Sequence, residues 1–363
     1  MAIFFAIGIL IGATLNLFFF EPCAGIEIYP QFYSKISDIE NIKKSPASGI
    51  DKSVKFKVKK DNRVYIIRGD GTISVNKDVK TRLTAFSGDG SHFIKYLKTG
   101  NEIEYYNISG DRYWKMKSKE YPYLSYNGRL ILLLNADHSM VRIIDNNGVE
   151  IGEKIVSGRM CSSISFSRGS DFGGFGFLDG SFYFVNVKGN ILYKGKVKEL
   201  NMVKGLSISR SGGYAAVHYG NTETDYIRVI NTADRDYEDI KLFDVHRAKT
   251  SLKINNDGYA AIIDKNRVIV IDDSGDVEYV IKIFPKRYGT SSIGFNEIGN
   301  NDGIYSVSYT KSKGDARLIV FKKSGLIILS KDFTNETYLK TSVAGNLIFL
   351  RGSDSLYCYS FHR

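Results

Sequence analysis

The residue types that most often carry chemistry are few in this chain and lie far apart. The histidines are His92, His138, His218, His246 and His362, and the cysteines are Cys23, Cys161 and Cys358. None of them joins a group of His, Cys and carboxylate residues at a spacing typical of metal ligands. The sequence also lacks a P-loop, a Rossmann fingerprint and a nucleophile elbow. We therefore predict no catalytic residue, no metal site and no cofactor, and we expect the protein not to be an enzyme.

The composition is that of a folded protein with a basic bias. The 363 residues include 50 Lys and Arg against 39 Asp and Glu, which gives a formal net charge of +11. Hydrophobic residues make up 43% of the chain, so extensive disorder is excluded. Nucleic-acid binding would need a basic groove with stacking aromatic residues. The aromatic residues here follow strand periodicity and belong to a core, so nucleic acid is not an expected partner.

The N-terminal segment is the longest apolar run. Residues 2–20 contain no charge, and about 20 apolar residues suffice to cross a bilayer as a helix. This pattern predicts a transmembrane anchor or uncleaved signal over residues 1–20, with a cleaved signal peptide and a buried core helix as alternatives. Pro22-Cys23-Ala24 is a poor cleavage site. Acidic residues outnumber Lys35 up to residue 40, so we expect the following domain to lie outside the cytoplasm, in the periplasm or at the cell surface.

A basic cluster follows this segment. It consists of Lys43, Lys44, Lys52, Lys55, Lys57, Lys59 and Lys60. If these side chains face a bilayer, they could bind anionic head groups with about 1 kcal/mol each. The alternative interpretation is a solvated linker followed by an exposed strand face.

The rest of the chain reads as short strands separated by turns. Runs such as RVYIIR, LILLL, FYFVNV and RVIVID are rich in β-branched and aromatic residues and are bounded by Gly, Asn, Asp and Ser. That pattern is typical of an all-β protein.

The turns recur at a nearly constant spacing. Most have Asp or Asn first and Gly fourth, as a type I turn favours, and the Gly tolerates a positive φ. The glycines that define this repeat are Gly71, Gly110, Gly148, Gly189, Gly275 and Gly325. The first four are separated by 39, 38 and 41 residues. The turn at 231–234, Asn-Thr-Ala-Asp, lacks the glycine.

A second marker with the same period lies between these turns. It is an apolar residue, a small or polar residue and a polar turn, as in Phe86-Ser87, Leu124-Ser125, Ile208-Ser209 and Ile254-Asn255. Two markers with one period of about 40–45 residues, and four strands per unit, indicate a β-propeller.

The strand pattern favours eight blades, with seven as the alternative. The last unit lacks its fourth strand, which residues 26–33 could supply, so that both termini close the ring. The first strand of the first blade would then fall near Ile39 and Ile42. We accordingly expect an anchor at 1–20, a linker at 21–53 that includes the closing strand, and the propeller at 54–363.

On these markers the chain resembles the WD40-like and quinoprotein-like propeller class over residues 26–363. The resemblance rests on period and turns, because no WD dipeptide is present and Trp114 is the sole tryptophan. Quinoprotein enzymes carry a tryptophan in most blades, so the sequence departs from them. Its membrane-anchored setting is similar to that of the eight-bladed scaffold lipoproteins of the outer-membrane protein assembly machinery.

Three functions follow from this pattern. The first is a non-catalytic, membrane-anchored scaffold of the cell envelope that binds other envelope proteins. The second is an enzyme or a small-molecule or glycan receptor at the mouth of the propeller channel. Its mark would be polar groups converging from the first strands of several blades. The third is a structural component of a secretion or motility machine.

Overall fold

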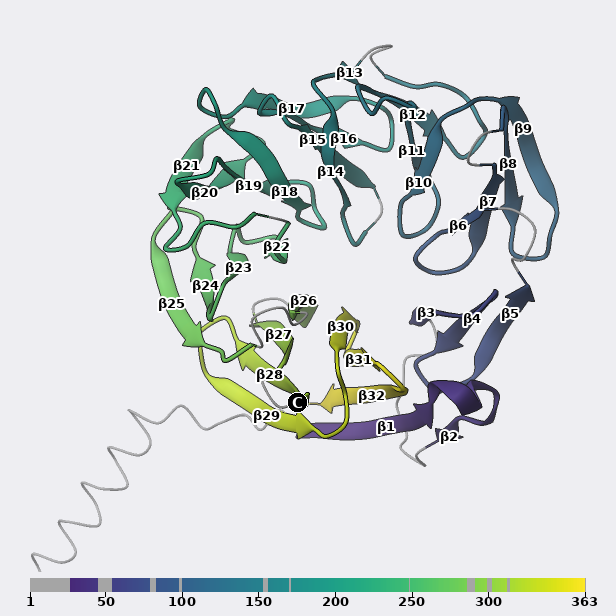
Figure 1. The fold of residues 1–363 in the computed structure, drawn as a ribbon, viewed down its shortest axis with the longest axis vertical. Coiled ribbons are helices and arrows are strands. Elements are labelled where there is room, and N and C mark those ends of the chain that lie inside the picture. Colours follow the sequence, from purple (N-terminus) through teal and green to yellow (C-terminus); the bar gives the residue numbers. More distant parts are fainter. Residues whose placement is uncertain are drawn as a thin grey trace, which may run out of the picture.

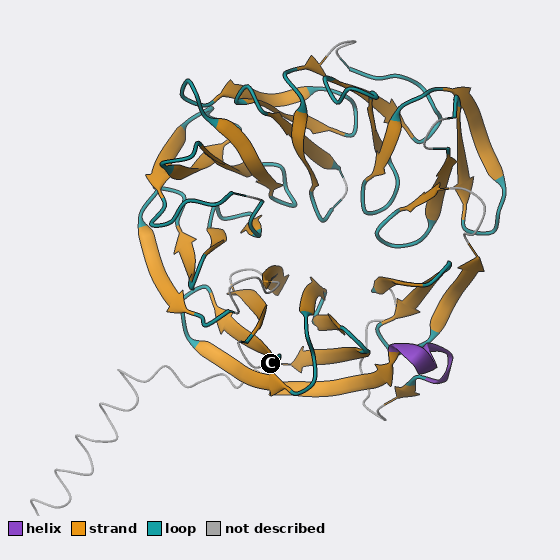
Figure 2. Cartoon of the chain, in the orientation of Figure 1, coloured by secondary structure: helices purple, strands orange, loops and turns teal. Residues whose placement is uncertain are grey.

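The ring of strands is described for most of the chain. The computed structural model describes residues 27–44, 54–78, 83–97, 100–152, 156–169, 171–247, 249–285, 291–298, 302–311 and 314–362. Within them the strands form eight sheets arranged as blades around a common axis (Figure 1). The sole helix of this part of the chain is a short 3-10 segment beside the rim (Figure 2). The prediction of an all-β propeller with eight blades is therefore confirmed.

Six blades each contain four antiparallel strands in sequence order, from the axis to the rim. Blades 2 and 3 are β6 (Leu83–Phe86), β7 (His92–Tyr96), β8 (Glu102–Asn107), β9 (Arg112–Lys117), and β10 (Tyr121–Leu124), β11 (Leu130–Leu134), β12 (Met140–Asp145), β13 (Val156–Ser157). Blades 4 and 5 are β14 (Cys161–Phe166), β15 (Phe172–Phe177), β16 (Ser181–Asn186), β17 (Ile191–Lys196), and β18 (Met202–Ile208), β19 (Tyr214–Gly220), β20 (Asp225–Asn231), β21 (Tyr237–Lys241). Blades 6 and 7 are β22 (Leu252–Ile254), β23 (Ala260–Asp264), β24 (Arg267–Ile271), β25 (Val277–Lys282), and β26 (Ser291–Ile298), β27 (Asp302–Thr310), β28 (Ala316–Lys322), β29 (Ile327–Phe333).

Blade 8 joins the two ends of the chain. It contains β30 (Leu339–Ala344), β31 (Leu347–Gly352) and β32 (Ser355–His362). Its outer strand is β1 (Glu27–Lys35), which pairs antiparallel with β32 along its whole length. The strand that the sequence predicted at 26–33 thus closes the ring, because it completes the blade that contains the C-terminal strand β32.

Blade 1 has three strands among the described residues, namely β3 (Lys55–Lys60), β4 (Arg63–Arg68) and β5 (Ile73–Asp78). The expected first strand near Ile39 and Ile42 is wrong. Residues Ile36–Asn41 form the 3-10 helix η1, and β2 (Lys43–Lys44) pairs with β1 at the rim. Ile39 is buried in a core cluster with Phe32 and Phe56, so its apolar side chain serves packing at the rim. Part of the expected linker therefore belongs to the propeller.

Both repeat markers have a clear structural cause. The six repeat glycines have φ between +80° and +105°, a region that favours glycine. In the second marker, the serine that follows the inner strand accepts a hydrogen bond from the backbone N–H five residues later, at 3.0–3.2 Å. This bond recurs at Ser87, Ser125, Ser167 and Ser209. Each hydroxyl thus closes one hairpin of its blade.

The core lies between adjacent blades. Ala216, Ile227 and Val229 of blade 5 pack against Leu252 and Ile262 of blade 6 in one buried cluster. The next cluster around the ring joins blades 6 and 7 in the same way. Because each blade is held on both sides, the connecting segments are presented by a rigid frame.

The antiparallel order divides the connections between two faces. Turns from the first to the second strand and from the third to the fourth strand lie on one face, which we call the turn face; it contains the repeat glycines. Turns from the second to the third strand lie on the opposite face together with the described parts of the blade-to-blade connections, at 158–160, 197–201, 242–247, 249–251 and 283–285. We call this the loop face.

The described residues include no helix long and apolar enough to cross a membrane. The anchor predicted at 1–20 lies outside the described residues.

Candidate functional site

The loop face carries the most exposed large apolar side chains of the described residues. Leu200 is 94% exposed, Phe284 is 70% exposed and Phe243 is 65% exposed. They lie on three successive blade-to-blade connections, from blade 4 to blade 7. Large apolar side chains that are exposed to this degree are frequent in surfaces that bind a partner. The arrangement is therefore a candidate docking face.

Leu200 also has an unfavourable backbone conformation. Its φ is +63°, and that of Met160, on the preceding connection, is +56°. This left-handed region costs a residue with a Cβ atom roughly 1–2 kcal/mol. Glycine would fit both positions with less strain. An exposed apolar side chain at such a position contributes little to the fold, which favours a role in binding.

The connection that presents Phe243 is fixed by hydrogen bonds and stacking. The Phe243 backbone N–H donates to Asp264 Oδ2 at 3.1 Å. The guanidinium of Arg267 lies over the Phe243 ring, 4.5 Å from its centre. The neighbouring Asp244 forms an ion pair with Lys265 at 3.1 Å. The ring is thus exposed and yet held in one place.

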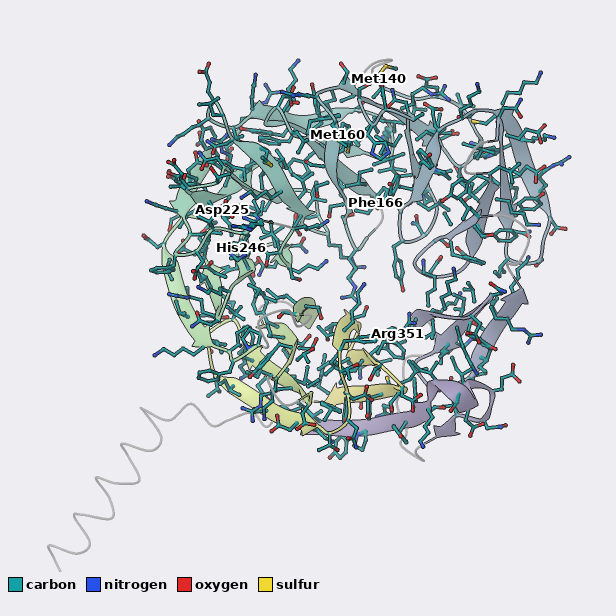
Figure 3. All side chains as sticks on the ribbon, in the orientation of Figure 1. Met140, Met160, Phe166, Asp225, His246 and Arg351 are labelled. Atoms are coloured by element: carbon teal, nitrogen blue, oxygen red, sulfur yellow. The ribbon has the colours of Figure 1, made fainter. Side chains whose placement is uncertain are left out.

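A buried polar network holds the rest of this connection. The carboxylate of Asp225 accepts hydrogen bonds from the Lys204 ammonium, from His218 Nε2 at 2.9 Å and from the His246 backbone N–H at 2.8 Å. Lys204 also donates to the His246 carbonyl at 2.7 Å. His246 Nε2 lies 2.8 Å from Asp264 Oδ1. Asp225 and His246 lie close together between blades 5 and 6 (Figure 3).

The network combines a charged pair with a neutral imidazole. Burial lowers the pKa of His218, and the hydrogen bond to Asp225 only partly opposes this shift, so the imidazole is neutral. For Asp225, burial raises the pKa, but the hydrogen bonds from His218 and Lys204 outweigh it, so the net pKa is lowered. The carboxylate is therefore ionised and paired with Lys204. Since the side chains of His218 and Asp225 are fully buried, no substrate can reach them. The network positions the loop.

The sequence did not predict this network. His218 and His246 were expected to be isolated, whereas their rings lie 5.5 Å apart, between centres. The residues come from two blades, and only the alignment of repeats would have placed strand β20 beside the 242–251 connection. No group of three or more His, Cys, Asp or Glu side chains in the described ranges could hold a metal ion.

The basic residues singled out in the sequence do not form one surface. Lys52 lies outside the described residues, and Lys43 and Lys44 lie on the rim strand β2. Lys55, Lys57 and Lys59 share one side of β3, the innermost strand of blade 1. Lys60 donates to the Ser37 carbonyl at 2.9 Å. Contact of this segment with a membrane stays a prediction.

Comparison with known proteins agrees with the ring of blades. The profile of one family, described as beta-propeller protein, matches residues 4–358. The chain belongs to this family. The crystal structure of BamB from Moraxella catarrhalis superimposes with a TM-score of 0.57 at 11% sequence identity, over 93% of this chain and 99% of that chain. At this identity the likeness shows the fold alone. No curated protein matches the sequence.

As a beta-propeller protein, the chain offers a rigid ring with two chemically different faces. The turn face consists of repeated polar turns with the same internal hydrogen bonds. The loop face is irregular and carries the three most exposed large apolar side chains of the described residues. The loop face is therefore the candidate docking surface.

Proposed function

We propose that this propeller is a non-catalytic interaction scaffold that docks a protein partner on its loop face. The observation that carries the proposal is that Leu200, Phe243 and Phe284 are the most exposed large apolar side chains and occupy successive connections of that face. Burial of each by a partner would contribute about 1.5–3 kcal/mol. A few residues usually carry most of the binding energy of an interface.

The rigidity of the Phe243 connection supports the same proposal. Ordering a loop on binding opposes association, so a loop that is ordered beforehand binds more tightly. Lys204, Asp225 and His246 hold this connection from below. The face is thus ready to bind without first folding.

We further propose that the scaffold is anchored in a membrane by residues 1–20 and acts outside the cytoplasm, with other envelope proteins as partners. The support is the uncharged run at 2–20 and the scarcity of basic residues around it. The propeller would then stand on the membrane as a platform for an envelope assembly.

The test is affinity purification of the full-length tagged protein from its own membranes in mild detergent. The wild type is compared with Leu200→Ser and Phe243→Ser, and with Leu326→Ser as the matched control. Leu326 is 51% exposed and follows Gly325 on the turn face.

We expect a reproducible set of proteins that both loop-face variants lose and the control retains. Equal recovery by all variants would contradict docking on the loop face. A monomer with no partner would contradict the scaffold function as a whole.

A further inference from the structure

Lysines lie on the strands at the inner edge of three blades. Lys57 on β3, Lys253 on β22 and Lys340 on β30 each stand between two buried neighbours and are themselves exposed to solvent. These strands belong to blades 1, 6 and 8 and face the axis of the ring (Figure 1). In Figure 3, side chains that end in nitrogen extend from the inner strands toward the centre.

Two further cations reach the same region. Lys249 lies just before β22, and its ammonium donates to Ser163 Oγ of blade 4 at 3.4 Å, so its side chain spans the inner edge of blade 5. Arg168 lies in the turn after β14, and its guanidinium is close enough to lower the pKa of Lys253. We call Lys57, Arg168, Lys249, Lys253 and Lys340 the axial cluster.

The members of the axial cluster repel one another. Burial among protein atoms, followed by the charges of Arg168, Lys249 and Lys340, lowers the pKa of Lys253 to about 8. The pKa of Lys57 is lowered by burial and then by Lys340. The side chain of Lys253 is exposed to solvent although many protein atoms surround it.

The hydrogen bonds of these lysines do not neutralise their charge. Lys57 donates to the Phe86 carbonyl at 3.2 Å, and Lys249 donates to a serine hydroxyl. Both acceptors are neutral. Among the described residues, no carboxylate contributes to the pKa shifts of Lys57, Lys249 and Lys253. Like charges held together in this way destabilise the folded state, which is typical of a site whose ligand supplies the opposite charge.

We infer that the axial cluster is a binding site for a compact multivalent oxyanion, such as a small molecule with several phosphate or carboxylate groups. The cations come from four blades and converge on one region, so a single ligand can contact several of them only if its charges are close together. An acidic peptide spreads its charges along the chain, at about 3.3 Å per residue in extended form, and would satisfy fewer of them at once.

This site is independent of the proposed docking face. The inner-strand lysines lie on strands beside the axis, whereas Leu200, Phe243 and Phe284 lie on the blade-to-blade connections of the loop face. An experiment can therefore contradict anion binding at the axis without contradicting docking on the loop face, and the reverse.

Calorimetric titration of the full-length protein in detergent, at physiological ionic strength, tests the inference. The probes are inorganic tripolyphosphate, citrate and a flexible oligoglutamate peptide. The variants are Lys253→Gln and Lys340→Gln, and the control is Lys194→Gln. Lys194 is an exposed residue of the rim strand β17, and its substitution removes the same charge.

We expect saturable binding of tripolyphosphate or citrate at about one site per chain. Each axial substitution should weaken it about tenfold or more, since a charge-assisted hydrogen bond is lost. The control should bind as the wild type does. No saturable binding, or equal weakening in the control, would overturn the inference. Tighter binding of the peptide than of either small anion would also overturn it and would assign the axis to an acidic segment of a protein.

Thermal unfolding without any anion provides a second readout. Relief of repulsion should raise the Tm of Lys253→Gln by roughly 1–3 °C while its stabilisation by tripolyphosphate is lost. A lower Tm, with the anion effect intact, would show that Lys253 serves packing alone.

Discussion

The two faces of this propeller differ in the regularity of their connections. On the turn face, one hydrogen-bonded hairpin is repeated from blade to blade, with a serine hydroxyl inside it and a glycine at the positive φ. On the loop face, each connection has its own length and its own contacts, and Leu200 adopts a conformation that a glycine would adopt with less strain. The regular hairpins of the turn face are explained by the stability of the fold. The strained, exposed Leu200 of the loop face is not, which favours a role in binding.

The largest effect is expected at the buried network below the loop face. Asp225→Ala leaves the Lys204 ammonium buried without its carboxylate, which typically costs about 3–5 kcal/mol. Urea unfolding measures the loss. Asp145→Ala is the comparison on the turn face, where the carboxylate accepts backbone N–H groups of an exposed turn and its loss costs about 1 kcal/mol. Similar losses of unfolding free energy in both variants would contradict the larger contribution that we assign to the buried network.

Acid should destabilise the fold through His218, which belongs to the buried network below the loop face. Since burial lowers the pKa of this imidazole below the 6.5 of an unfolded chain, the unfolded state binds a proton that the folded state resists as the pH falls below 6.5. The free energy of unfolding should therefore decrease from pH 7 to pH 5, and less steeply in His218→Gln. Chemical denaturation at several pH values checks this. A steeper decrease in the variant would show that the imidazole is charged in the fold.

The repeated serine gives a smaller effect. Ser209→Ala removes the acceptor of the Tyr214 N–H at 3.1 Å and should destabilise the fold by about 1 kcal/mol. Ser211→Ala, in the same turn but more exposed, is the control and should change the stability less. Equal effects would mean that the hairpin does not depend on the repeated hydroxyl.

These contrasts also explain what the sequence could predict. The period, the eight blades and the closing strand followed from local markers, because each turn and each strand is determined by adjacent residues. The prediction of a strand near Ile39 was wrong for the opposite reason, because the structure there depends on contacts with distant residues. An apolar residue at strand spacing can be buried equally well in a 3-10 turn, and only its contacts with Phe32 and Phe56 decide.

The candidate sites depended on contacts between blades. Asp225 of blade 5 and His246 of the connection to blade 6 are 21 residues apart, and nothing in either local sequence indicates their contact. Lys57, Lys253 and Lys340 are even farther apart. Lys57 appears in the sequence as part of the basic cluster and the other two as single lysines of a strand, and the closed ring brings them to one axis. The sequence predicted the general feature of a ligand site, which is a set of polar groups that converge from the first strands of several blades. It did not identify the residues of that site.

A matched pair of glycine substitutions tests the central claim most directly. Leu200 on the loop face and Arg235 on the turn face have nearly the same backbone, with φ of +63° and +62°. Leu200→Gly and Arg235→Gly should each stabilise the fold by about 1 kcal/mol, because the strain at the Cβ atom disappears. The measurement is partner recovery from native membranes, with the stability of each variant determined alongside. The account predicts that Leu200→Gly, though more stable, loses the partner, whereas Arg235→Gly keeps it. Full recovery with Leu200→Gly would contradict the assignment of docking to the loop face.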